Sequence, residues 1–115
     1  MANLKRNMIE LVVGVNGEEV VTEKYWTPAF IPMGIVYQAI DIMSETEKDE
    51  VSERDAIDRL LDFVANDIYQ GKFTKEELLN GLHAPDAIKT LQEQILFIAQ
   101  GQQTSETKKF LERKS

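Results

Sequence analysis

The sequence predicts an α+β fold that is mostly α: an N-terminal β-hairpin followed by a bundle of about four helices. Three observations support this prediction. Residues 8–25 alternate like paired strands, the apolar residues after Pro32 recur at helical spacing, and glycine or proline separates the helical stretches. The 115 residues, of which 43% are hydrophobic, suffice for one domain with a single core.

The predicted hairpin joins residues 8–15 to residues 18–25 through the pair Asn16-Gly17. Asn-Gly is the strongest short hairpin signal, because a type I′ turn needs positive φ at both central residues. A two-stranded hairpin is marginally stable alone, so we expect a helix to cover one face and leave the strand edges open. On the first strand the covered face should carry Ile9, Leu11 and Val13.

The stretch 25–45, YWTPAFIPMGIVYQAIDIMSE, changes from strand-like to helical periodicity. Pro28 should end the second strand because proline donates no backbone hydrogen bond, and Pro32 suits the first turn of a helix. Two neighbouring rows at helical spacing should form one wide apolar face: Ile35, Ala39 and Ile42, and beside them Val36, Ile40 and Met43.

Two further helices are predicted between residues 52 and 81. Ser52 and Asp55 form a weak capping box before a helix that should end at Gly71. A more complete capping box, Thr74 with Glu77, opens a short helix that should end at Gly81. The first of these helices carries the cleanest apolar stripe in the chain: Ile57, Leu60, Leu61, Val64 and Ile68.

The last predicted helix begins at Pro85 and stops at Gly101. Its inward residues should be Ile88, Leu91, Ile95 and Ile98. After Gly101 the apolar periodicity is lost. We therefore expect a globular domain over residues 1–101 and a flexible or partner-ordered C-terminal segment over residues 102–115.

The net charge of −7 and the pI near 4.7 disfavour two classes of partner, nucleic acid and anionic membranes, because both are bound through clustered Lys and Arg. No cysteine is present, so disulfides, thiol nucleophiles and zinc–thiolate sites are excluded. No stretch has the length and apolarity of a signal peptide or a membrane span. We expect a soluble, cytoplasmic protein.

No catalytic, cofactor or metal site is predicted, and the chain is not expected to be an enzyme. His83, the single histidine, lies between two helices without a nucleophile or an orienting carboxylate in its motif, so a structural role is expected. The acidic run of residues 45–50 lacks the central glycine of an EF-hand loop and contains Lys48, so a solvated charge run is the better interpretation.

Binding surfaces have better support than chemistry. A chain of this length cannot bury every large apolar residue around the first helix together with the stripes of the later helices, so part of that set should form a contact patch. A short helical anchor in the basic sequence KKFLERK is a second candidate. The alternatives are core packing for the first group and a disordered segment for the second. The partner-binding candidates are Trp26, Phe30, Ile31, Met33, Tyr37, Phe110 and Leu111.

The chain resembles the tail assembly chaperones of long-tailed, siphovirus-type phages and prophages of Gram-positive bacteria, the counterparts of the lambda G protein. Two blocks within residues 8–101 carry the resemblance. The first is the hairpin that runs into YWTPAFIPMGIVYQAIDIMSE, and the second is DRLLDFVANDIYQGKFTKEELLNGLHAPDAIKTLQEQILFIAQG. Both consist of packing and turn motifs, so the resemblance identifies no functional residue.

The resemblance implies a non-enzymatic scaffold that binds the tape measure protein, keeps it soluble and helps recruit tail tube subunits. It also implies action in the bacterial host cytoplasm, absence from the mature virion, self-association, and an extended isoform, made by translational frameshifting, that contacts the tube protein. Two other functions stay open from the residues alone. One is a small acidic phage-encoded inhibitor or nucleic-acid mimic, suggested by nine acidic against three basic residues in 41–62. The other is a structural head–tail joining protein.

Overall fold

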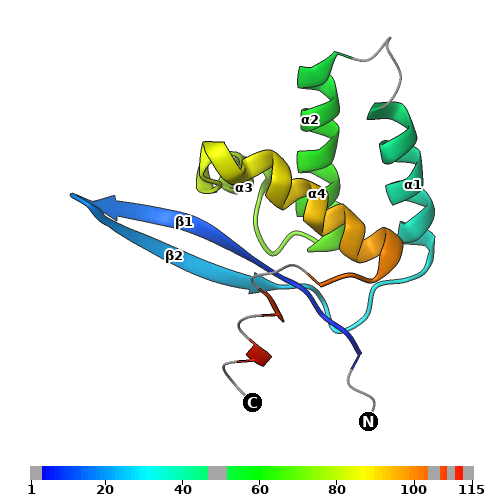
Figure 1. Ribbon diagram of the computed structural model, residues 1–115, viewed down its shortest axis with the longest axis horizontal. Helices are drawn as coiled ribbons and strands as arrows, with labels where there is room; N and C mark the ends of the chain where they lie inside the picture. The colour runs from blue at the N-terminus through cyan, green and yellow to red at the C-terminus, as the bar shows by residue number, and fades with distance from the viewer. Residues whose placement is uncertain (1–3, 47–51, 104–106, 109–110, 113–115) are drawn as a thin grey trace.

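A two-stranded antiparallel hairpin precedes the helices in the computed structural model (Figure 1), which describes residues 4–46, 52–103, 107–108 and 111–112. The predicted α+β, mostly α fold is confirmed, with four α-helices and one π-helical turn among these residues. The elements are β1 (Met8–Asn16), β2 (Glu19–Trp26), α1 (Gly34–Thr46), α2 (Glu53–Asp62), η1 (Phe63–Ile68), α3 (Lys75–Gly81) and α4 (Ala84–Gln100).

The hairpin turn differs from the predicted one. Asn16 pairs with Glu19 at the end of the ladder, so the two-residue loop is Gly17-Glu18. Gly17 has a φ of 61°, whereas neither Asn16 nor Glu18 has positive φ. Positive φ at the first central residue alone fits a type II′ turn, so the predicted type I′ turn on Asn16-Gly17 is wrong.

A β-bulge in β1 explains why the turn lies one residue later than predicted. Val12 pairs with Thr22 and Gly14 pairs with Val21, which leaves Val13 as the extra residue of β1. Ile9 and Leu11, before the bulge, are 1% and 2% exposed, whereas Val13 is 55% exposed. The prediction that Val13 shares their buried face is therefore wrong, because the inserted residue interrupts the alternation of the strand.

The connection from the hairpin to α1 follows the proline signals. β2 ends at Trp26, two residues before Pro28, as predicted. The helix begins at Gly34, and the carbonyl of Pro32 accepts a hydrogen bond from the Ile35 N–H at 3.1 Å. On α1, Ala39 and Ile42 are buried, but Ile40 is 49% exposed and does not belong to the core-facing side.

The helix that starts after Ser52 changes from α-helical to π-helical geometry before it ends. The Ser52 hydroxyl accepts the Asp55 N–H at 3.1 Å, as the capping motif predicts. α2 then runs directly into the π-helical turn η1, which the sequence analysis did not foresee. A π-turn places an additional residue in one turn of the helix. Three consecutive residues, Phe63, Val64 and Ala65, are consequently all buried.

The last two helices begin and end where predicted to within a residue or two. The complete Thr74–Glu77 capping box is present, and α3 ends at Gly81. α4 stops at Gly101, whose φ of 71° lies in the left-handed region favoured by glycine. The buried residues of α4 start at Leu91; Ile88, in the second turn, is 41% exposed rather than inward.

The hydrophobic core lies between one face of the hairpin and the helices. Side chains of β1, α1, α2, η1, α3 and α4 form one buried cluster. In Figure 1 the helices cover the part of the hairpin nearest its open ends, and the turn end projects beyond α3. The fold therefore has a covered end of the hairpin, which we call the base, and a projecting end, which we call the tip.

Candidate partner-binding surfaces

The predicted partner-binding residues have different surroundings in the structure. Phe30, Met33 and Tyr37 are 63%, 73% and 66% exposed. Trp26 and Ile31 are half-buried, and Ile31 packs against the core. Leu111 is 40% exposed, and Phe110 lies outside the described residues.

Two of the three exposed residues, Met33 and Tyr37, share one apolar side of α1 with Ile40. Met33, Tyr37 and Ile40 are spaced four and three residues apart, which places them on the same side of the helix. Phe30 lies in the connection just before this helix. We call Phe30, Met33, Tyr37 and Ile40 the α1 surface. Ile40 was missed as a surface residue because its position also fits the inward row, although its spacing from Met33 and Tyr37 indicated this side.

The connection before α1 is fixed at its start by hydrogen bonds. The Thr27 N–H donates to the Asn7 carbonyl at 2.9 Å, and the Asn7 N–H donates to the Thr27 hydroxyl at 3.0 Å. The Lys72 ammonium donates to the Trp26 carbonyl at 2.7 Å, and the Arg6 guanidinium donates to the Thr27 carbonyl at 2.8 Å. These bonds tie the end of β2 and the start of the connection to the residues before β1 and to the loop before α3.

The hairpin tip is a second exposed apolar region, and sequence reasoning did not identify it. Val15 and Val20 are directly paired, and both are more than half exposed. Val13 and Val21 are also exposed. A Cβ added at Gly14, the partner of Val21, would meet no atom within 4 Å. Neither face of the hairpin is therefore covered at the tip.

The hairpin base, in contrast, contains a buried network of polar side chains around Gln94 of α4. The Gln94 amide oxygen accepts hydrogen bonds from the Tyr69 hydroxyl at 2.6 Å and from the Asn7 amide at 3.2 Å. The Gln94 amide nitrogen donates to the Met8 carbonyl at 3.1 Å. Burial raises the pKa of the Tyr69 hydroxyl well above its ordinary value, so this side chain stays neutral.

Side chains of the C-terminal segment also reach the base. Thr107 is fully buried; its hydroxyl donates to the Asn7 amide oxygen at 2.8 Å and accepts the Met8 N–H at 3.1 Å. The Gln103 amide donates to the Arg6 carbonyl at 2.8 Å. These contacts place residue 107 beside the start of β1. The domain boundary at residue 101 stays a prediction.

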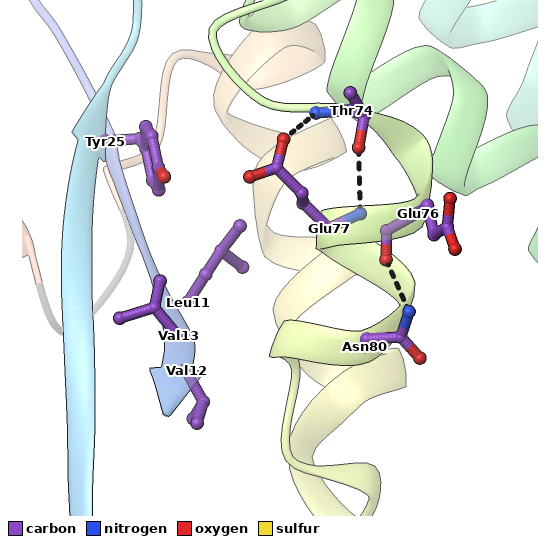
Figure 2. A pocket seen from close by; sticks show the side chains of 8 residues that line it. All are labelled: Leu11, Val12, Val13, Tyr25, Thr74, Glu76, Glu77 and Asn80. Atoms are coloured by element: carbon purple, nitrogen blue, oxygen red, sulfur yellow. Dashed lines mark hydrogen bonds between the residues drawn. The ribbon is translucent and has the colours of Figure 1, made fainter. Parts of the chain in front are cut away.

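A groove of about 370 Å³ separates β1 from α3 (Figure 2). Its strand side is mostly apolar and its helix side is polar and acidic. The groove is lined by Leu11, Val12, Val13, Tyr25, Thr74, Glu76, Glu77 and Asn80.

Negative charge gathers beside Tyr25 in this groove. The pKa of the Tyr25 hydroxyl is raised, first by partial burial and then by the carboxylates of Glu23 and Glu77. The Tyr25 hydroxyl lies 3.2 Å from a Glu23 carboxylate oxygen. Glu77 points toward the hairpin while it accepts the Thr74 N–H of its capping box (Figure 2). None of the eight side chains that line the groove is basic.

In the described part of the acidic stretch 41–62, several carboxylates form ion pairs with basic side chains. Glu45 pairs with Arg59 at 2.9 Å. Asp58 and Asp62 both pair with Lys75 of α3, at 2.6 Å and 3.3 Å. Most of the run considered for calcium, residues 47–50, lies outside the described residues. These ion pairs weaken the case for a nucleic-acid mimic, which needs unpaired negative charge.

The structure offers little for catalysis at His83. This residue is exposed at the start of α4, and its carbonyl accepts the Asp86 N–H at 3.0 Å. Its side chain makes no capping hydrogen bond. Among the described residues, no helix has the length and apolarity to cross a membrane.

Residues 3–115 match the family described as "Phage tail chaperone protein". Comparison with curated proteins and with solved structures gives no match.

Proposed function

The chain belongs to the phage tail chaperone family, and we propose that in tail assembly it binds the tape measure protein, keeps it soluble and helps recruit tail tube subunits. The proposed role is non-enzymatic. It is exercised in the cytoplasm of the bacterial host, and the chaperone does not remain in the finished virion.

The α1 surface carries this proposal. Four large apolar side chains are each about half exposed or more: Met33, Tyr37 and Ile40 share one side of α1, and Phe30 lies in the connection before it. A tape measure protein is long and rich in amphipathic helix, so before assembly it exposes apolar stripes. Packing such a stripe against the α1 surface removes apolar area of both proteins from water, at about 25 cal/mol per Å².

Tail tube recruitment is assigned to the extension of the frameshifted isoform, which adjoins the predicted binding residues Phe110 and Leu111. Both residues lie in the basic sequence KKFLERK at the end of the chain. An extended isoform, if translation shifts frame near this end, continues from the same segment. Contact with the tube protein then occurs at the opposite end of the chain's sequence from the hairpin.

Co-expression with the tape measure protein of the same genome tests the proposal. We expect the two proteins to copurify, and the complex to survive high salt because apolar contacts are little screened. A variant with Met33→Asp and Tyr37→Asp should lose copurification and leave the tape measure protein insoluble. Leu79→Asp is the matched control, because Leu79 is 58% exposed on α3, away from the α1 surface.

Three results would contradict the proposal. Copurification lost on raising the salt concentration would indicate an acidic inhibitor that binds a basic partner. Detection of the chain in purified virions would indicate a head–tail joining protein. Equal loss of binding in the Leu79→Asp control would show that the α1 surface is not the binding site.

A further inference from the structure

The β1–α3 groove combines an apolar wall with a carboxylate-rich wall. Leu11, Val12 and Val13 line it from the strand, and residues of α3 line it from the helix. Of the two glutamates on α3, Glu77 extends its carboxylate toward the hairpin, whereas the Glu76 carboxylate points away from it (Figure 2). Glu23 adds another carboxylate: it pairs with Leu11 across the hairpin and lies beside Tyr25. The ligand that fits such a groove is a peptide with apolar side chains next to lysine or arginine.

The chain itself contains a segment of this chemistry. Residues 108–114, KKFLERK, hold four basic residues and one acidic residue around the apolar pair Phe110-Leu111. A groove of about 370 Å³ lies at the lower end of the range of roughly 300–1,000 Å³ that is typical of small-ligand pockets. The groove therefore has room for side chains of the segment, and its charge is opposite to that of the segment.

The described residues of this segment do not line the groove of their own molecule. Thr107 is anchored to Asn7 and Met8 at the hairpin base. In Figure 1, the described residues 107–108 and 111–112 lie on the other side of the hairpin from α3. Lys108, Leu111 and Glu112 are exposed there. The described part of the segment thus lies on one side of the hairpin, and the groove lies on the other.

We propose that residues 108–114 of one copy dock into the β1–α3 groove of a second copy. Phe110 and Leu111 pack against the apolar wall formed by β1, and the lysines and arginine lie along the carboxylates of β2 and α3. The contact joins two different surfaces, so it is heterologous and repeats from copy to copy into a ring or an open filament. This proposal does not depend on the identity of the client protein.

A pair of charge-reversal variants tests the proposal in the full-length chain. Glu23→Lys alters the groove without touching the capping box, and Lys108→Glu with Lys109→Glu alters the segment. Sedimentation velocity of the wild type at low salt should show concentration-dependent association. Each variant should weaken that association by about tenfold or more, with unchanged circular dichroism. Glu19→Lys, on the same strand next to the turn, is the control and should associate like the wild type.

Mixing the two variants gives the decisive result. The groove variant still has a normal segment, and the segment variant still has a normal groove, so one intact contact forms between them. We expect a 1:1 heterodimer that does not grow further. A monomeric wild type at every concentration overturns the proposal, as does association that Glu23→Lys leaves unchanged or a mixture that stays monomeric. Each of these results leaves the tape measure proposal intact.

Discussion

The base and the tip of the hairpin belong to the same two strands but are stabilised in opposite ways. At the base, Met8, Ile9 and Asn7 are at most 2% exposed, and polar groups beside them are paired with Gln94, Thr27 and Thr107. At the tip, four valines are exposed and neither face is covered. The base is thus required by the fold, whereas the tip leaves apolar area that the fold does not use. The following changes test this difference, from the largest expected effect to the smallest.

Gln94→Leu should be the most damaging change. It leaves the Met8 carbonyl, the Asn7 amide and the Tyr69 hydroxyl without their partner in a buried site. We expect the free energy of unfolding to fall by about 3–5 kcal/mol, because each unpaired buried polar group costs roughly 1–3 kcal/mol. Urea unfolding measures the change. Gln92→Leu, at an exposed position of the same helix, is the control, and an equal loss there would refute a special role for Gln94.

Gly81→Ala tests where the covered part of the hairpin ends. An added Cβ at Gly81 would lie 3.0 Å from the Leu11 Cβ and 3.2 Å from the Val12 carbonyl oxygen. Because both are close to the backbone of β1, α3 must shift, and we expect a loss of about 1–3 kcal/mol in urea unfolding. Gly34→Ala meets open space at the start of α1 and should be neutral or slightly stabilising. Equal effects of both changes would mean that α3 does not press on β1.

The pH dependence of stability, compared between the wild type and Tyr69→Phe, tests whether the Tyr69 hydroxyl is buried at the base. In the folded state burial raises the pKa of Tyr69, whereas the unfolded chain has a pKa near 10. Above about pH 10 the unfolded state releases this proton and the folded state keeps it, so the wild type should lose stability as pH rises. Tyr69→Phe should lose about 1 kcal/mol at neutral pH but show a shallower alkaline decline. Some decline remains, because the pKa of Tyr25 is also raised. Identical pH profiles would contradict the buried position of the hydroxyl.

Thr107→Val removes the hydroxyl that ties the C-terminal segment to the base. Because water can reach the Met8 N–H once the segment detaches, we expect a loss of only about 1 kcal/mol in stability. Trypsin should cleave after Lys108 and Lys109 faster, and the Met8 amide should exchange its hydrogen faster. Thr107→Ser keeps the hydroxyl and should behave like the wild type. If both variants are cleaved at the wild-type rate, the hydroxyl does not hold the segment.

Val15→Thr combined with Val20→Thr should have the smallest effect. Threonine keeps the branched shape that suits a strand, and both positions are more than half exposed. We expect the free energy of unfolding to change by less than about 0.5 kcal/mol. A loss above about 1 kcal/mol would show that the tip is packed in solution, and the contrast with the base would not hold.

Local signals account for most of the elements. Helix starts and stops depend on contacts within four residues, so they can be predicted from the sequence. Examples are the caps formed by Thr74 with Glu77 and by Ser52 with Asp55, and the stop at Gly101. Three of the predicted binding residues, Phe30, Met33 and Tyr37, are exposed as a partner surface requires. Whether they bind a partner stays a prediction. Ile40 escaped the analysis because two rows of one helix overlap, and only the neighbouring elements decide which row is covered.

The sequence alone determined the hairpin-then-helices order and the helix ends to within a few residues, because these depend on backbone preferences and short spacings. Which residues of the apolar stripes face inward was decided only in part, since Val13, Ile40 and Ile88 are exposed. The tertiary structure decided the bulge at Val13, the π-turn at Phe63–Ile68, the network around Gln94 and the burial of Thr107. The Asn7 contacts with Gln94 and Thr107 join residues 87 and 100 positions apart. No local pattern encodes such a pair, since its partners meet only when the whole chain has packed and buried polar groups must be satisfied.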